Sequence, residues 1–212
     1  MSGCECGQRA QHRRVVLTGG PGAGKTAVLE LVRHALAPHV DVLPEAASIL
    51  FVGGFRRCVT DVGQQATQRG IFHVQREVEA IADAEGKAAL EVCDRGSVDG
   101  FAYWPGDAAG FWAALGTTQA AELARYRAVI HLRTPSAGNG YNHDNPVRIE
   151  SADEAARIDA RIELAWQGHP RRFVVQSTAD FLTKANQAIA LLRAELPERC
   201  LAALQAAHPT KG

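Results

Sequence analysis

A glycine-rich octapeptide near the N-terminus combines the residue types that bind phosphate. Its pattern is G-x-x-x-x-G-K-T, from Gly19 to Thr26. Glycines allow successive backbone N–H groups to converge on phosphate oxygens, which Cβ atoms would obstruct. The lysine of this pattern reaches the β- and γ-phosphates, and the hydroxyl after it ligates Mg²⁺. We therefore expect ATP or GTP with Mg²⁺ to bind at eight consecutive residues: Gly20, Pro21, Gly22, Ala23, Gly24, Lys25, Thr26 and Ala27.

The flanking sequence predicts the elements that would position this loop. Residues 15–18 form a short apolar run typical of a strand, and apolar residues then recur at helical spacing from Val28 to Leu36. A helix that begins inside the loop directs its free N–H groups and the positive end of its dipole at a bound anion. The strand, loop and helix together predict a phosphate-binding loop (P-loop).

The rest of the chain alternates short β-like runs with longer helical patterns, which is typical of parallel strands joined by helices. We predict a three-layer α/β/α P-loop NTPase fold with a five-stranded parallel sheet, its strands at 15–18, 40–43, 89–93, 128–132 and 173–175. A long helix before Gly86 should bury the stripe Ile71, Val74, Val78 and Ile81. We expect a flexible tail at 1–13, one domain at 14–196, and a helix or tail at 197–212.

Two acidic residues follow predicted strands, at the edge where parallel sheets bind ligands. Asp94 is expected to bind Mg²⁺ through water or to orient an acceptor hydroxyl; the alternative is a structural cap. Glu45 holds the equivalent position after residues 40–43, where it is either functional or an exposed carboxylate at a helix start. Arg95 could neutralise developing charge or hold the substrate. The candidate catalytic residues are Lys25, Glu45, Asp94, Arg95 and Arg148, and the candidate Mg²⁺ ligands are Thr26 and Asp94.

Two absences favour phosphoryl transfer over hydrolysis. Arg95 stands where a hydrolysing ATPase carries a glutamate, and the chain has no N-K-x-D guanine-reading motif. We therefore predict a small-molecule kinase that phosphorylates an unidentified hydroxyl acceptor. The alternative from another class is an ATP- or GTP-binding regulatory protein or slow NTPase without a small-molecule acceptor.

The constellation Asp94-Arg95-Gly96-x-x-Asp99 resembles the D-R-G-x-x-D signature of a family of AAA-like ATPase and kinase domains. That family includes relatives of the ribosylnicotinamide kinase domain, and it resembles deoxynucleoside kinases with their D/E-R-S motif. The resemblance spans about residues 14–195. It implies a nucleoside-like acceptor, with Glu45 as the base. Ser48 departs from the pattern, in which arginine often occupies this position.

Other side chains leave two interpretations open. Arg148, Arg157 and Arg161 could form a phosphate-binding lid, or the latter two a solvated face beside Asp153 and Glu154. Four aromatic residues could line a substrate pocket or belong to the core: Phe101, Tyr103, Trp104 and Phe111. Residues 133–146 should form a mobile polar loop. Asp99 is interpreted as a cap or a partner of Arg95, and His73 and His131 as structural residues without visible partners.

Composition narrows the remaining function classes. Lysine plus arginine and aspartate plus glutamate number 23 each, so we expect no nucleic-acid partner. The five cysteines are scattered, which suits a reducing cytoplasm. Cys93 should be buried, and the Cys4–Cys6 pair more often belongs to a reduced tail than to a metal site. We expect no membrane span and no signal peptide, hence a cytoplasmic protein, and leave a homodimer open.

Overall fold

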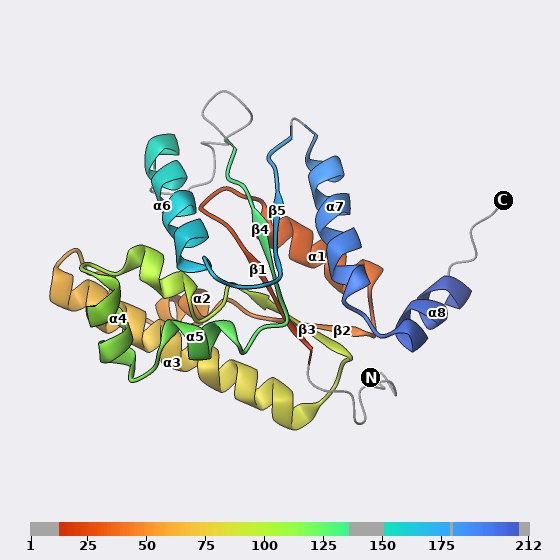
Figure 1. Ribbon diagram of the computed structural model, residues 1–212, viewed down its shortest axis with the longest axis horizontal. Helices are drawn as coiled ribbons and strands as arrows, with labels where there is room; N and C mark the ends of the chain where they lie inside the picture. The colour runs from red at the N-terminus through yellow and green to blue at the C-terminus, as the bar shows by residue number, and fades with distance from the viewer. Residues whose placement is uncertain (1–12, 136–150, 179, 208–212) are drawn as a thin grey trace.

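In the computed structural model, which describes residues 13–135, 151–178 and 180–207, a parallel sheet lies between two layers of helices (Figure 1). Its strands are β1 (Arg14–Thr18), β2 (Val40–Leu43), β3 (Leu90–Asp94), β4 (Ala128–Leu132) and β5 (Arg172–Val175), in the spatial order β2-β3-β1-β4-β5. All neighbouring strands are parallel. The predicted fold class and the five predicted strands are therefore confirmed, with bounds shifted by at most one residue.

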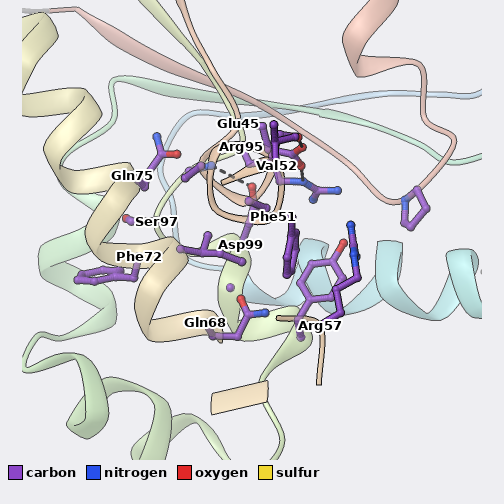
Figure 2. Close-up of a pocket in the computed structure, with 18 of the residues that line it drawn as sticks. Glu45, Phe51, Val52, Arg57, Gln68, Phe72, Gln75, Arg95, Ser97 and Asp99 are labelled. Carbon is purple, nitrogen blue, oxygen red and sulfur yellow. Dashed lines mark hydrogen bonds and ion pairs between the residues drawn. The ribbon is translucent and has the colours of Figure 1, made fainter. Parts of the chain in front are cut away.

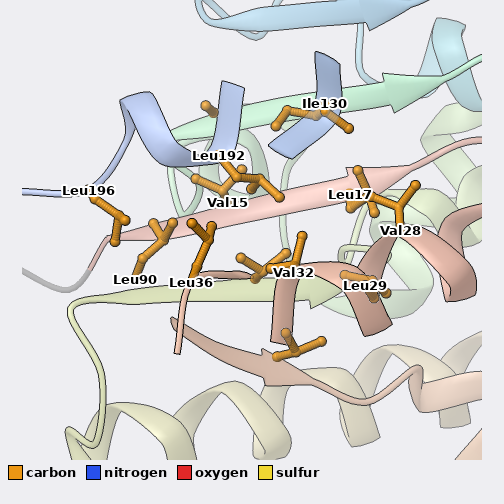
Figure 3. Packing of buried hydrophobic residues seen from close by; sticks show 14 of the residues in the cluster. Val15, Leu17, Val28, Leu29, Val32, Leu36, Leu90, Ile130, Leu192 and Leu196 are labelled. Atoms are coloured by element: carbon orange, nitrogen blue, oxygen red, sulfur yellow. The ribbon is translucent and has the colours of Figure 1, made fainter. Parts of the chain in front are cut away.

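One face of the sheet is covered by α1 (Lys25–Ala35), α7 (Phe181–Ala194) and α8 (Glu198–Ala207) (Figure 1). Their apolar side chains form one continuous core with the inward residues of the strands, including Val28, Val32 and Leu192 (Figure 3). Val28 and Val32 lie four apart on one side of α1, which is the spacing that the sequence predicted for a buried helix face.

The opposite face carries α3 (Asp61–Glu85), α5 (Gln119–Leu123) and α6 (Ala152–Ala165) (Figure 1). The 3-10 helix η2 (Asp99–Tyr103) contacts α3 and α6, and α2 (Ala46–Val52) and α4 (Ala108–Leu115) pack against α3. The core on this side includes Ile162 and Trp166 from the predicted stripe of α6, and Cys93, which is buried as expected. Ser151 caps α6, because its Oγ accepts a hydrogen bond from Glu154 N at 3.2 Å.

The stripe predicted for helix α3 is only partly buried: Ile71, Val74 and Val78 are half-buried, and Val78 packs against the core. Ile81 is 57% exposed, whereas Gln75, Glu79 and Ala82 are buried with Phe72. The prediction followed apolar spacing alone, but burial of a polar side chain is tolerated where hydrogen-bond partners are supplied. Distant residues supply those partners here, among them Arg14 and Tyr126, which both contact the carboxylate of Glu79.

Strand register brings the ends of three strands to the start of the P-loop. Leu17 on β1 is paired with Asp94 on β3, and Thr18 is paired with His131 on β4. The first glycine of the loop follows directly, so groups from both neighbouring strands lie beside it. None of the helices in the described part of the chain combines the length and apolar character that a membrane crossing needs.

Candidate functional site

The P-loop joins β1 to α1 in a conformation that requires glycine. Gly19 has φ 140°, and a Cβ at this position would lie 2.2 Å from the carbonyl oxygen of Leu132. Gly24, at the start of α1, has φ 89°. Residues with a Cβ rarely adopt such positive φ angles. The glycines of the motif therefore permit both the turn and the close approach of β4.

Lys25 is buried inside the curve of the loop. Its Nζ donates hydrogen bonds to the carbonyl oxygens of Gly19, at 3.0 Å, and Gly20, at 3.3 Å. Burial and, to a lesser extent, the charge of Arg95 lower the pKa of Lys25 to about 8, against the opposing effect of Asp94. The free loop thus holds a partly discharged ammonium group that a phosphate would stabilise in its charged form. Thr26, the predicted metal ligand, is exposed in the first turn of α1.

Asp159, a buried carboxylate on α6, accepts a hydrogen bond from the backbone of the P-loop. Asp159 Oδ1 accepts a hydrogen bond from Gly20 N at 2.8 Å and lies 2.9 Å from His131 Nε2, while Oδ2 lies 3.2 Å from Arg133 Nη1. Burial would raise the pKa of Asp159, but the hydrogen bonds from His131, Gly20 and Arg133 outweigh it and hold the pKa at about 2. His131 therefore has a partner that the sequence did not reveal, and Asp159 is a site residue that we did not predict.

Lys184 of α7 links the P-loop to the segment that follows β4. Its Nζ donates to the carbonyl oxygen of Ala23 at 2.8 Å and to that of Arg133 at 2.5 Å. The side chain is only 3% exposed, and burial lowers its pKa to about 8 although the charge of Asp159 works in the opposite direction. Two helices distant in sequence thus fix the shape of the P-loop before any ligand binds.

Asp94 stands at the end of β3, beside Lys25. Its Oδ1 is buried and has no hydrogen-bond partner among the described residues. Burial raises the pKa of Asp94 above its ordinary value, although the charge of Lys25 opposes this. An unsatisfied buried oxygen has no role as a helix cap, whereas it suits a Mg²⁺ ion or its bound water. The donor set of Thr26 and Asp94 therefore fits the cation that the P-loop implies.

Arg95 and Glu45 form an ion pair next to Asp94. Arg95 has φ 70°, which is rare outside glycine, and its Nε donates to Glu45 Oε1 at 2.8 Å. Ser48 Oγ donates to the other oxygen of Glu45 at 2.5 Å. Burial would raise the pKa of Glu45, but the charge of Arg95 and these two hydrogen bonds hold it below its ordinary value. Glu45 directly precedes α2. Because both of its carboxylate oxygens have partners, it is not simply a solvent-exposed carboxylate at a helix start.

Asp99 organises the turn that carries this pair. Its Oδ1 accepts hydrogen bonds from Thr18 Oγ1 and Trp166 Nε1, both at 2.7 Å, and its Oδ2 accepts one from Gly96 N at 2.9 Å. The predicted role as a cap matches the bond to Gly96, while within the described part of the chain Asp99 makes no hydrogen bond to Arg95. A Cβ on Gly96 would lie 2.8 Å from the Trp166 ring, which explains the glycine of the D-R-G motif.

A cavity of about 480 Å³ opens directly beside the loop (Figure 2). Its walls come from the P-loop, the turn after β3, and helices α2, α3 and η2, and they include Gly22, Glu45 and Arg95. Its other walls are mostly apolar or aromatic, with two amides from α3: Phe51, Phe72, Tyr103, Gln68 and Gln75. The volume suits a small organic molecule.

The remaining predicted residues are distributed differently. Tyr103 lines the cavity, whereas Trp104 and Phe111 pack against each other in a separate core cluster. Arg161 Nη2 donates to Trp104 O at 3.0 Å and so joins α6 to η2, and Arg157 is exposed. Arg148, Cys4, Cys6 and most of the predicted loop at 133–146 lie outside the described residues.

The sheet order, the loop and the adjoining cavity define the class of P-loop nucleotide-binding proteins. Residues 14–184 match the model of an AAA domain family, and the chain belongs to that family. The predicted resemblance to AAA-like ATPase and kinase domains is therefore confirmed. Among curated proteins, none matches the chain in sequence.

Solved structures share the fold at low sequence identity. A deoxyadenosine kinase from M. mycoides with bound dATP is similar at a TM-score of 0.58 and 14% identity, covering 85% of this chain and 99% of the other. A thymidylate kinase from Ehrlichia chaffeensis is similar at a TM-score of 0.58 and 12% identity, covering 86% of this chain and 100% of the other. At this level of identity the likeness establishes a shared fold, that of nucleoside and nucleotide kinases.

Proposed function

We propose that this protein is a Mg²⁺-dependent kinase that transfers the γ-phosphoryl group of ATP to a hydroxyl of a small, nucleoside-like acceptor. The observation that carries the proposal is the cavity beside the P-loop, with Glu45 and Arg95 where the two meet. A nucleotide held by the loop would present its terminal phosphate toward a molecule in that cavity. A protein that only bound nucleotide would have no need of a second pocket beside the P-loop.

The roles follow from charge and position. Lys25 would neutralise the phosphates, and Thr26 and Asp94 would hold the Mg²⁺ that neutralises them further. Glu45 lines the cavity and is kept ionised by Arg95, so it would accept a hydrogen bond from the acceptor hydroxyl and orient it. Its lowered pKa makes it a weak base, but phosphoryl transfer depends mainly on positioning and on charge neutralisation. Arg95 would also stabilise the negative charge on the oxygens of the phosphoryl group during its transfer.

The first test measures ADP formation with ATP and Mg²⁺ across a panel of nucleosides and other hydroxyl compounds. We expect at least one nucleoside-like compound to raise ADP formation well above the rate without acceptor. The double variant Glu45→Gln, Arg95→Met should lose this stimulation while still binding ATP. ATP binding with no stimulation by any compound would reject the kinase proposal and favour the regulatory alternative.

The titration of Lys25 gives a prediction about pH. The pKa of about 8 in the free loop should rise when phosphates surround the ammonium group, so ATP binding takes up a proton above pH 8. Affinity should be highest below pH 8 and should then fall by up to about tenfold per pH unit until the pKa of the complex is reached. Calorimetric titrations at pH 7.5–9.5, in two buffers of different ionisation enthalpy, measure both effects. Constant affinity with no proton uptake would contradict this account of Lys25.

A further inference from the structure

The deep wall of the cavity is formed by polar groups whose hydrogen bonds are already assigned. Gln75 and Ser97 are each 3% exposed, whereas Arg57 at the other side of the cavity is exposed and lies 3.9 Å above the Phe51 ring (Figure 2). Ser97 Oγ donates to Glu122 Oε2 at 2.7 Å, and its backbone N–H donates to the Tyr126 hydroxyl at 2.8 Å. Ser97 Oγ also accepts a hydrogen bond from the Tyr126 hydroxyl at 3.0 Å, so both donors of Ser97 are engaged and at most one lone pair of its oxygen is left for the cavity.

Gln75 is fixed by a carboxylate behind it. Its Nε2 donates to Glu79 Oε1 at 2.9 Å. Glu79 is fully buried, and its other oxygen forms ion pairs with Arg14, at 3.3 Å, and Arg125. A carboxylate paired with two arginines only accepts hydrogen bonds. The amide of Gln75 cannot rotate by 180°, because its oxygen would then face an oxygen of Glu79.

The amide oxygen of Gln75 is consequently turned away from Glu79, toward the cavity (Figure 2). Together with Ser97 Oγ it gives the deep wall two hydrogen-bond acceptors. Gln68 lies seven residues, or two helical turns, earlier on α3 and also lines the cavity. Its side-chain amide makes no hydrogen bond to any of the described residues, so its orientation is not fixed. Glu79, which itself lies outside the cavity lining, therefore sets the orientation of the Gln75 amide, while Glu122 holds Ser97.

We infer that Glu79 is a positioning residue for acceptor selection, and that the group bound at the deep wall carries an N–H or O–H donor at the edge of its ring. This inference rests on the proposed function, since it identifies the cavity with the acceptor site. Among nucleosides, it selects bases whose edge donates a hydrogen bond over otherwise matched bases whose edge cannot.

Matched nucleoside pairs test the selection. Adenosine and purine riboside differ by one exocyclic amino group, and uridine and 3-methyluridine differ at the N3 donor. For the pair that the wild type binds more tightly, we expect about three- to tenfold tighter binding of the donor-bearing member, measured by calorimetry. The ratio should fall toward one in Glu79→Gln and in Gln75→Leu, with unchanged ATP affinity. Glu91→Gln is the control, because Glu91 also pairs with Arg14 but lies outside the cavity lining.

A second measurement reports on Gln75 without any acceptor. In NMR spectra of ¹⁵N-glutamine-labelled protein, the side-chain amide signal that disappears in Gln75→Leu belongs to Gln75. Its protons should exchange with solvent at least tenfold more slowly in the wild type and in Glu91→Gln than in Glu79→Gln. If Glu79→Gln does not fold, Gln75→Leu still decides the binding ratio.

The outcomes separate this inference from the kinase proposal. Equal binding of both members of each pair, no binding of either, or amide exchange that is insensitive to Glu79→Gln would overturn the inference. If ADP still forms with some other acceptor, the kinase proposal survives that result. If no acceptor supports ADP formation, the kinase proposal fails, and slow amide exchange with donor-selective nucleoside binding would still support the role of Glu79.

Discussion

Replacing Asp94 with asparagine is expected to lower kcat by about two to three orders of magnitude, which is the usual effect of removing one group that stabilises transition-state charge. Asparagine keeps the size of the side chain but loses the negative charge proposed to hold Mg²⁺. Asp94 Oδ1 has no hydrogen-bond partner in the described structure, so the fold should not depend on the charge. ADP formation measured against acceptor and Mg²⁺ concentration should show a large loss in kcat, an increased requirement for Mg²⁺, and a smaller change in ATP affinity.

The matched control is Asp41→Asn. Asp41 lies on β2, paired in register with Glu91 and away from the P-loop, so this variant should retain wild-type kcat. An Asp94→Asn variant with wild-type kcat and an unchanged Mg²⁺ requirement would show that this carboxylate takes no part in phosphoryl transfer. A variant that loses its thermal unfolding transition would instead indicate a structural role.

Replacing Asp159 with alanine is expected to lower the free energy of unfolding by about 3–5 kcal/mol, because it leaves buried polar groups without their acceptor and removes one of the two carboxylates that pair with Arg133. The partners of Asp159 are His131, Arg133 and the N–H of Gly20. The affinity for ATP should fall as well, since the first turn of the P-loop loses its anchor. Denaturant unfolding and calorimetric ATP titrations measure the two effects.

The pH dependence of stability gives an independent test of the same anchor. The pKa of Asp159 is about 2 in the folded protein, against about 3.9 in an unfolded chain. Its stabilising contribution is therefore complete above pH 4 and is lost as the pH falls toward 2. The difference in stability between wild type and Asp159→Ala should shrink over this window. Asp153→Ala, an exposed position on the same helix, should show neither effect, and equal losses in both variants would contradict the anchoring role.

The P-loop and the two strand-end residues were predictable because their signals are local. Gly19 to Thr26 is a contiguous pattern, and the strands before Glu45 and Asp94 are short apolar runs ended by polar residues or proline. The topology then places both carboxylates at the same edge of the sheet, as parallel strands require. The fold and the phosphate side of the site therefore followed from spacing alone.

The supports of the site left no comparable signal. Asp159 and Lys184 contact the loop across 139 and 161 residues of chain, and each appears in its own helix as an ordinary polar residue. The polar face of α3 was missed for the same reason, since Glu79 is buried only because Arg14, Arg125 and Tyr126 reach it from other elements. Partners that meet only in the folded chain cannot be found from periodicity.

The bonds from Lys184 to the P-loop also bear on how the protein is made. The loop is synthesised among the first residues, yet the helix that fastens it to β4 emerges from the ribosome only after about nine-tenths of the chain. Contacts of such long sequence separation form late, because the intervening chain must first be ordered. The nascent protein should therefore acquire its phosphate-binding geometry near the end of translation, and a chain released before α7 should contain the whole P-loop motif without a formed site.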